Sequence, residues 1–332
     1  MKALNANAEE VIINLEELIG QGAEGKVYKA TSARFDIPIV AKHQQIKASF
    51  QPILDSLIAS ILISAKPTSC NARIMCLQGV VINPTRAPTK KMDKIPQLKQ
   101  LFFLSDELSP DELYLLYEYI EGTTLKSALH TGDKLKYCHQ LLQAISFMHK
   151  RTVVHLDIKP DNIMITKEDN IKIVDLGLMC VSGEKTCVRR GITPEYGAPE
   201  AFEKSDDKSL LFASDIFALG LTLYEILTEK EVFTVKTAFD FTSSGDELDL
   251  VFSKEQEKWK PFIQSLVLRE PKARPSAAQA FAEFKTINAG NAVNMAEGKI
   301  NKIRSKAAGG KRNTVKNRNS RYRSVTFSAA TP

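Results

Sequence analysis

The sequence predicts an α+β fold built from two lobes, and two observations support this prediction. Short apolar runs separated by turn residues dominate the first third of the chain, whereas stretches with helical periodicity dominate the remainder. The chain has 332 residues, of which 43% are hydrophobic and 25% charged, as is ordinary for a globular protein, and its length fits one two-lobed enzyme or two modest domains. We therefore expect a small β-rich lobe followed by a larger helical lobe.

The expected elements follow one another in a simple order. Two strands should flank a glycine-rich turn within residues 11–30, and further strands are expected at 37–43, 74–83 and 113–120. Residues 83–109 contain three prolines and read as a long surface connector rather than as core. Helices are expected at 49–64, 125–130, 134–150, 213–228, 254–268 and 276–285.

The two ends of the chain differ from this body. Residues 1–11 read as an N-terminal extension. Residues 286–332 hold ten Lys or Arg against one acid, a charge of +9, which leaves −3 for the rest of a chain whose net charge is +6. Because this tail has few large apolar residues, we predict that it is disordered. It is either a solvated tail without function or a segment that binds acidic lipid, nucleic acid or an acidic protein.

Composition also bears on the cellular compartment. No apolar run reaches the roughly 18 residues of a membrane span, and the N-terminus lacks the basic start and apolar core of a signal peptide. The five cysteines are an odd number without C-x-x-C spacing, so we predict neither a disulfide framework nor a zinc site. A reducing, cytoplasmic compartment is expected.

The chemistry is concentrated in the run His155-Leu156-Asp157-Ile158-Lys159-Pro160-Asp161-Asn162, followed thirteen residues later by Asp175-Leu176-Gly177. Phosphoryl transfer from Mg-ATP to a hydroxyl needs a carboxylate to orient the hydroxyl, a cation near the phosphate, and oxygen ligands for the metal. This spacing resembles the catalytic and magnesium loops of eukaryotic-type protein kinases. The resemblance extends over residues 12–285 and implies a bilobal protein kinase fold, with lobes at about 12–118 and 121–285.

The resemblance assigns roles to the residues of these loops. Asp157 would be the base, Lys159 would neutralise the γ-phosphate, and Asn162 and Asp175 would hold Mg²⁺, with Mn²⁺ as the alternative ion. Thr193 belongs to a T-P-E-Y-x-A-P-E run, residues 193–200, which is similar to the substrate floor of Ser/Thr kinases. A lysine two residues after the aspartate likewise resembles Ser/Thr rather than tyrosine kinases.

The ATP pocket is expected in the first lobe. The pattern Gly20-x-Gly22-x-x-Gly25 alone fits an ordinary hairpin turn equally well, but a strand after it favours a kinase-type phosphate loop over a dinucleotide fold. Lys42 resembles the lysine that holds the α- and β-phosphates, and residues 117–120 resemble the hinge that holds adenine. The ATP-binding residues implied by the resemblance are Gly20, Gly22, Gly25, Val27, Ala41, Lys42, Asp55, Tyr117, Glu118 and Ile120.

Two departures from the family concern regulation. No glutamate lies between Lys42 and Glu107, so the helix acid that pairs with the lysine is missing. Asp55 is the best substitute and Gln51 a weaker one, unless Asp55 is only a solvated helix residue. Leu156 replaces an arginine that grips an activation-loop phosphate, so phosphorylation of that loop should not be the main switch. A third departure, Leu176 for phenylalanine, is an apolar exchange.

Two structural anchors complete the resemblance. Glu200 should pair with Arg274 in a buried ion pair, and Asp215 should accept hydrogen bonds from the catalytic-loop backbone. The resemblance implies a kinase acting on Ser or Thr of a protein substrate. The alternative is a pseudokinase, a scaffold that binds partners through the fold. The unusual first lobe suits either a divergent eukaryotic kinase or a bacterial effector of eukaryotic type acting in the host cytosol.

Overall fold

The protein is described from a computed structural model, which describes residues 1–22, 25–46, 49–63, 73–203 and 207–290. The chain forms two compact units, Met1–Phe281 and Ala282–Pro332. The elements described below lie in the first unit. The predicted disordered tail begins at residue 286, but residues 286–290 are helical. Residues 291–332 lie outside the described residues, so their disorder and their partners stay predictions.

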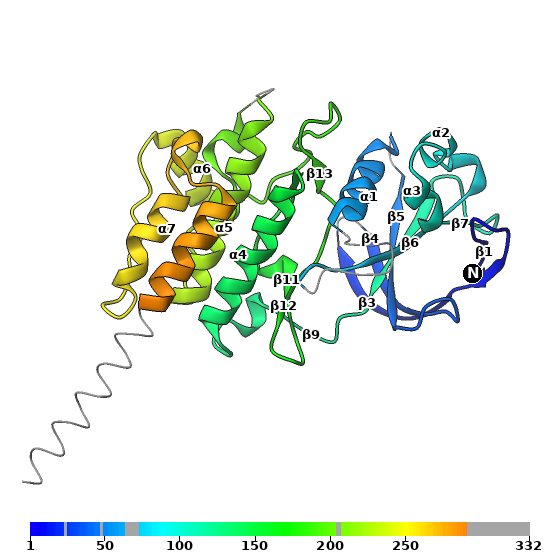
Figure 1. The fold of residues 1–332 in the computed structure, drawn as a ribbon, viewed down its shortest axis with the longest axis horizontal. Helices are drawn as coiled ribbons and strands as arrows, with labels where there is room; N and C mark the ends of the chain where they lie inside the picture. Colours follow the sequence, from blue (N-terminus) through cyan, green and yellow to red (C-terminus); the bar gives the residue numbers. More distant parts are fainter. Residues whose placement is uncertain (23–24, 47–48, 64–72, 204–206, 291–332) are drawn as a thin grey trace, which may run out of the picture. The chain divides into compact units, whose positions relative to one another are not determined.

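An eight-stranded sheet forms the first part of the chain (Figure 1), with the strand order β2-β1-β7-β6-β8-β5-β4-β3. Neighbouring strands pair antiparallel, except for the parallel pair β6 and β7. Alternate side chains of the strands fill an apolar core beneath the sheet. The strands are β1 (Lys2–Leu4), β2 (Glu10–Ile12), β3 (Asn14–Gly22), β4 (Gly25–Thr31), β5 (Ile39–Gln45), β6 (Leu77–Ile82), β7 (Phe102–Leu104) and β8 (Glu112–Glu118).

The prediction of a surface connector at residues 83–109 was wrong. This stretch contains α2 (Thr89–Met92), α3 (Pro96–Leu101) and β7, and Leu98, Phe102 and Phe103 are at most 2% exposed. The prolines misled because proline is as well suited to the first turn of a helix as to a loop, and Pro96 begins α3. Residues 1–11, expected as an extension, contribute β1 and most of β2 to the same sheet.

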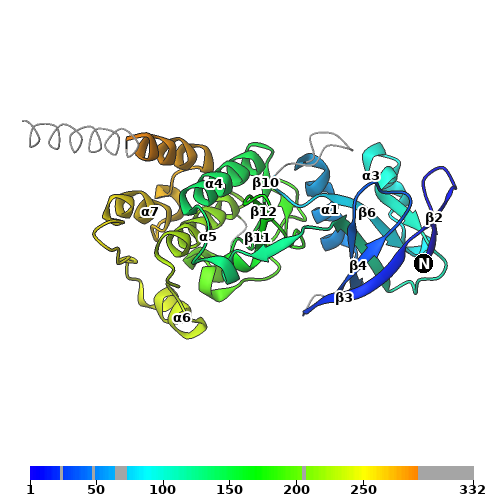
Figure 2. The same ribbon diagram turned by 90° about the horizontal axis from the view of Figure 1, so that it is seen from below.

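Helices form most of the remainder, as predicted (Figure 2). The expected helix at 125–130 is only the 3-10 turn Lys126–Ala128, and that at 254–268 is reduced to Glu257–Trp259 and α7. A small sheet, β12-β11-β9, and a two-stranded pair, β10-β13, carry the loops between the helices. The elements are α4 (Lys134–Lys150), α5 (Ser209–Thr228), α6 (Val235–Ser244), α7 (Lys260–Leu266), β9 (Gly122–Thr124), β10 (Val153–Val154), β11 (Ile163–Thr166), β12 (Ile171–Ile173) and β13 (Cys180–Val181).

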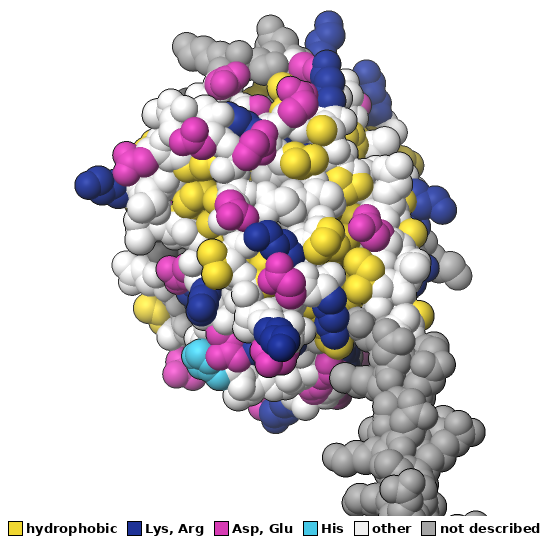
Figure 3. All heavy atoms as spheres, turned by 90° about the vertical axis from the view of Figure 1, so that its left-hand side faces the viewer, with side chains coloured by type: hydrophobic (Ala, Val, Ile, Leu, Met, Phe, Trp, Pro, Cys, Tyr) yellow, Lys and Arg dark blue, Asp and Glu magenta, His cyan; other side chains and the backbone are white. Residues whose placement is uncertain are grey.

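One helix of the described residues, α5, is long and apolar enough to cross a membrane by length and composition, but 83% of its apolar window is buried inside the protein. The apolar side chains of α5 therefore pack in the interior of the helical part of the protein. Figure 3 shows the face at the left of Figure 1, where acidic and basic side chains are interspersed with hydrophobic ones. In that view the described residues form a surface of mixed charge, not a field of one sign.

Candidate active site

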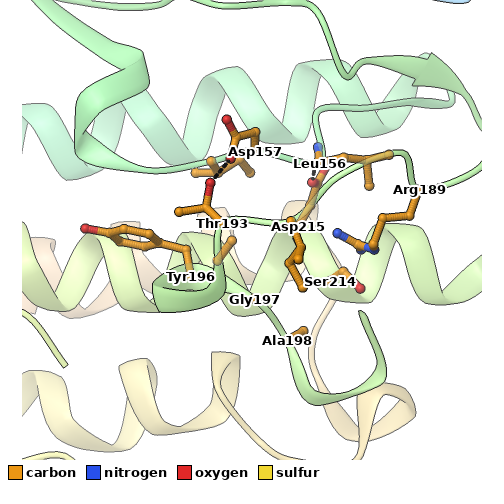
Figure 4. A pocket seen from close by; sticks show the side chains of 12 residues that line it. Leu156, Asp157, Arg189, Thr193, Tyr196, Gly197, Ala198, Ser214 and Asp215 are labelled. Atoms are coloured by element: carbon orange, nitrogen blue, oxygen red, sulfur yellow. Dashed lines mark hydrogen bonds between the residues drawn. The ribbon is translucent and has the colours of Figure 1, made fainter. Parts of the chain in front are cut away.

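The catalytic loop is fixed from below by a buried carboxylate of α5. Asp215, 1% exposed, accepts hydrogen bonds from the backbone N–H groups of His155 and Leu156, both at 2.8 Å (Figure 4). His149 Nε2 lies 2.9 Å from the same carboxylate. Leu156 has a φ of 68°, a left-handed conformation that is strained for leucine and that these bonds hold in place. The predicted contact between Asp215 and the loop backbone is confirmed.

Three side chains of the predicted catalytic set form a hydrogen-bonded triangle. Thr193 Oγ1 donates to Asp157 Oδ1 at 2.7 Å, as drawn in Figure 4, and Lys159 Nζ donates to Thr193 Oγ1 at 2.8 Å. Lys159 Nζ also lies 2.9 Å from Asp157 Oδ2. Asn162 Nδ2 donates to Asp157 Oδ2 at 2.7 Å. The carboxylate of Asp157 is thereby held in one orientation, with a cation beside it.

The second acid of the site lies opposite the lysine of β5. Lys42 Nζ donates to Asp175 Oδ1 at 3.0 Å, although the two residues are 133 positions apart in the chain. Burial of the Asp175 carboxyl opposes its ionisation, but the charge of Lys42 and its hydrogen bond outweigh burial, so the pKa of Asp175 is lowered. Asp175 is therefore an ionised carboxylate at neutral pH.

These groups border two adjoining cavities. A cleft of about 1040 Å³ is lined by the glycine hairpin and by five of the predicted site residues, Lys42, Lys159, Asn162, Asp175 and Thr193. A second cavity of about 370 Å³ shares Lys42 and Asp175 with it and has a mainly apolar lining. The predicted ATP residues that line one or both are Gly20, Gly25, Val27, Lys42, Tyr117, Glu118 and Ile120.

Two predicted ATP residues lie elsewhere. Ala41 is fully buried in the apolar core of the sheet, because its side chain points to the opposite face of β5 from Lys42. Asp55 lines neither cavity. Gly22 ends β3, and the turn residues 23–24 that follow it lie outside the described residues.

Strand packing requires a glycine at position 25 of the glycine hairpin. Gly25 has a φ of 140°, and a Cβ atom there would meet the backbone oxygen of His43 at 1.9 Å. Any other residue would push β4 away from β5, which carries Lys42. The predicted strand after the glycines is present as β4, as a kinase-type loop requires and a dinucleotide fold does not.

The hinge is pinned to the helical part by an ion pair. The carboxylate of Glu118, at the end of β8, accepts hydrogen bonds from Lys172 Nζ of β12 and from the backbone N–H of Cys76 at 2.7 Å. The backbone N–H of Glu118 also donates a hydrogen bond to the carbonyl oxygen of Cys76, at 3.0 Å. Tyr117, one residue earlier, is 5% exposed and stands at the inner wall of the smaller cavity.

Asp55 is bonded to the chain between Asp175 and Glu200, named here the activation segment, instead of to Lys42. Arg190 Nη2 lies 2.5 Å from Asp55 Oδ2, and Thr186 Oγ1 donates to Asp55 Oδ1 at 2.8 Å. Gln51 donates to the same Oδ1 at 2.7 Å. The prediction of an Asp55–Lys42 pair is therefore not met, and Asp55, at 6% exposure, is not a solvated residue either. No pattern in the sequence pointed to Arg190.

The prediction against disulfides was wrong as well. Cys180 and Cys187 form a disulfide within the activation segment, and both side chains are fully buried. The odd number of cysteines and the absence of C-x-x-C spacing were poor guides, because a pair seven residues apart can meet across a short loop. Leu156, which stands where the family has an arginine, packs in the same apolar cluster.

The sequence did not predict some of the groups that line the larger cavity. Glu225 of α5, 2% exposed, accepts hydrogen bonds from Lys126 Nζ at 2.6 Å and from Tyr196 Oη at 2.5 Å. Burial, followed by this hydrogen bond, raises the pKa of Tyr196 well above its usual value. Lys126 and Tyr196 both line the cleft. Lys126 Nζ also bonds to Glu231, so partners distant in the sequence hold this lysine in place.

The predicted anchor at the end of the activation segment is confirmed. Arg274 contacts Glu200 through two hydrogen bonds of 2.7 and 2.9 Å, and the arginine side chain is completely buried. Three backbone carbonyls accept its remaining N–H groups, so the buried charge is fully satisfied.

The metal ligands predicted by the sequence have suitable chemistry. Asn162 and Asp175 both reach the larger cleft and offer an amide and a carboxylate oxygen. Among the described residues no group of three or more His, Cys, Asp or Glu could hold a metal. Mg²⁺ does not need one, because it binds through one or two protein oxygens together with water and substrate phosphates. The residues present therefore fit Mg²⁺ bound jointly with a nucleotide.

Comparison with known proteins agrees with this geometry. The chain is 31% identical over 152 residues to a probable serine/threonine-protein kinase of Dictyostelium discoideum, covering 45% of this chain and 22% of that protein. It is 32% identical over 192 residues to myosin light chain kinase 2 of Bos taurus, covering 52% and 30%. To the serine/threonine-protein kinase PrkC of Bacillus subtilis it is 29% identical over 181 residues, covering 52% and 27%.

These alignments cover less than a third of the length of each relative. The family model described as "Protein kinase domain" matches residues 13–284, most of the chain. The chain therefore belongs to the protein kinase family.

Proposed function

We propose that this protein is an active serine/threonine kinase that transfers the γ-phosphoryl group of ATP to a Ser or Thr hydroxyl of a protein substrate. The observation that carries the proposal is the triangle of Asp157, Lys159 and Thr193. Two of its members, Lys159 and Thr193, line the cleft that also holds the Lys42–Asp175 pair. A carboxylate, two cations and a second carboxylate thus meet in one place, as phosphoryl transfer requires.

Each group has a role that its surroundings allow. Asp157 accepts the proton of the attacking hydroxyl, because its carboxylate is held by Thr193 and Asn162 in one orientation. Lys159 stands beside it and balances the negative charge that develops on the transferred phosphoryl group. Lys42 binds the α- and β-phosphates, and the hinge backbone at Glu118 and Ile120 binds adenine in the smaller, apolar cavity.

Asn162 and Asp175 would hold Mg²⁺, or Mn²⁺ as the alternative, and the ion would supply charge neutralisation between the phosphate oxygens. The lowered pKa of Asp175 means that its carboxylate is already ionised for this role. Thr193 forms the floor beneath the substrate hydroxyl, next to the residues 194–200 that close the activation segment.

A pseudokinase is the second candidate, and one observation favours it. Asp55, the only acid that the sequence offered to Lys42 as a helix partner, is instead bonded to Arg190. In this reading the fold binds partners without turnover. The complete set of Lys42, Asp157, Lys159, Asn162 and Asp175 favours catalysis.

Radiolabelled ATP with a generic basic protein as acceptor tests the proposal on the full chain. We expect Asp157→Asn to lower the rate of label transfer about 10²- to 10⁴-fold, and Asp175→Ala to abolish metal-dependent transfer. Asp249→Asn is the matched control, since that carboxylate is 82% exposed and lies outside the site. Transfer by wild type that does not exceed that of Asp157→Asn would support the pseudokinase.

A further inference from the structure

We propose that the Cys180–Cys187 pair is a redox site that sets the order of the activation segment, and that the disulfide form is the ordered, active one. The proposal concerns a covalent modification site within the chain. Its activity readout rests on the proposed kinase function, but the structural readouts below do not.

The disulfide ties the activation segment to the catalytic loop. Cys180 lies in β13, where it pairs with Val154 of β10, directly before the catalytic loop. Cys187 lies seven residues later, beyond the loop of residues 182–186. The disulfide therefore restrains Cys187 relative to β13. The residues that follow Cys187 are restrained with it.

The two sulfurs lie in an apolar cluster that suits a disulfide. Both cysteines are fully buried, and they share the cluster with Val154, Leu156 and Leu211. An apolar side chain at position 156 suits this cluster, because a charged side chain there would be buried against sulfur and methyl groups. Cys187 is also fixed through its backbone oxygen, which accepts a hydrogen bond from Lys208 Nζ at 2.7 Å.

The residues on either side of Cys187 connect the segment to α1 (Gln51–Ile63). Thr186 and Arg190 both bond to the Asp55 carboxylate, and Arg190 Nη1 also donates to the backbone oxygen of Pro52 at 3.2 Å. Asp55 is 6% exposed, so its carboxylate oxygens are satisfied by these partners rather than by water. Loss of the disulfide would free Thr186 and Arg190 to move, and the contact that joins α1 to the activation segment would open with them.

The same segment continues directly into the catalytic triangle. Thr193, which bonds to both Asp157 and Lys159, follows Arg190 by three residues. Arg189 extends toward Ser214 and Asp215 in Figure 4, so its side chain points toward the carboxylate that holds the catalytic loop. Loosening residues 186–190 thus removes a support on which the position of Thr193 depends.

The redox step balances as a thiol–disulfide exchange with a low-molecular-weight disulfide. One cysteine thiolate attacks the small disulfide, which releases one small thiol and leaves a mixed disulfide. The second cysteine thiolate then attacks the protein sulfur of this mixed disulfide and releases the second small thiol. Two protein thiols are oxidised and one small disulfide is reduced to two thiols. Because both sulfurs are buried, exchange requires the exposed loop 183–186 to open first.

The test uses the full chain, equilibrated in buffers of reduced and oxidised glutathione and then alkylated. Peptide mapping measures the fraction of Cys180 linked to Cys187, and hydrogen exchange measures protection of amides 181–192. We expect amides 186–190 to exchange about tenfold faster in the reduced form, with label transfer about tenfold slower. The double variant Cys180→Ser/Cys187→Ser should match the reduced form in every buffer. Cys138→Ala, at a buried cysteine outside the segment, should keep the wild-type response.

The outcomes separate this proposal from the kinase proposal. If the hydrogen-exchange rates of amides 181–192 follow the fraction of Cys180 linked to Cys187, the redox site is supported even if neither form transfers phosphate. A folded protein whose Cys180 and Cys187 stay unlinked in fully oxidised glutathione overturns it. So does a linked fraction that changes without any change in the exchange of amides 181–192.

Discussion

The catalytic loop and the first half of the activation segment lie side by side but are held by different means. Buried polar contacts fix the loop, with Asp215 beneath its backbone and Thr193 and Asn162 around Asp157. Residues 180–190 are fixed by a disulfide, an apolar cluster and the ion pair of Arg190 with Asp55. Apart from Leu156, the first region follows the kinase pattern, and the second departs from it.

This difference separates the requirements of chemistry from those of control. Groups that touch the phosphates must keep their relative positions, so their supports in α5 are conventional for the family. Groups that position the segment need only hold it in place, and a covalent bond with an apolar surrounding can serve as well as a charge pair. The departures at Leu156 and Asp55 therefore belong together, since both residues contact the segment 180–190 or its cluster.

The end of the activation segment offers the largest expected effect on folding. Replacing Arg274 by alanine leaves the carboxylate of Glu200 buried without its two hydrogen bonds, and we expect the free energy of unfolding to fall by about 3–5 kcal/mol. Urea denaturation measures it. Lys272→Ala, an exposed cation two residues away, is the control, expected within about 0.5 kcal/mol of wild type. A loss below 1 kcal/mol for Arg274→Ala would mean that this anchor matters no more than a surface pair.

Restoring the family's arginine at position 156 tests the apolar cluster around Cys180 and Cys187. In Leu156→Arg a guanidinium would enter the apolar cluster of Cys180 and Cys187, and we expect a loss of about 2–4 kcal/mol in the free energy of unfolding. Leu156→Met keeps the volume and the apolar character, and should cost less than about 1.5 kcal/mol. Equal stability of the arginine and methionine variants would show that the cluster does not require an apolar residue here.

Asp55 can be assigned to its partner by double-mutant cycles. We expect Asp55→Ala and Arg190→Ala to couple by about 1–3 kcal/mol in unfolding free energy, because each removes the same buried contact. The cycle of Asp55→Ala with Lys42→Ala is the matched control and should couple by less than about 0.5 kcal/mol. The reverse order of coupling would restore the pair that the sequence predicted.

The sequence could predict the site where its residues act through local spacing. Asp157, Lys159 and Asn162 belong to one loop, and Thr193 is placed by a recognisable run, so their meeting followed from the pattern. Asp55 and Arg190 are 135 residues apart, and the disulfide depends on how residues 180–187 fold back. Such contacts depend on how distant parts of the chain pack together, which local spacing does not reveal. The prediction for residues 83–109 failed for a related reason, since only packing decides whether a proline begins a helix or a loop.

The smallest expected effect concerns His155, at the start of the catalytic loop. Its ring is 1% exposed, and burial lowers its pKa below the usual value of about 6.5. Below that pH the unfolded chain binds a proton that the folded chain does not, so this group makes stability fall as the pH falls through the window below 6.5. Its contribution to the slope is at most about 1.4 kcal/mol per pH unit.

The measurement is the unfolding free energy between pH 7 and pH 5, compared for wild type and His155→Asn. The variant should show a shallower dependence on pH, whatever its stability at pH 7, because only the titrating group has been removed. His130→Asn, which removes a 75% exposed imidazole, is the control. Identical slopes for His155→Asn and wild type would contradict the buried neutral imidazole, and with it the view that the catalytic loop rests on a support that protonation weakens.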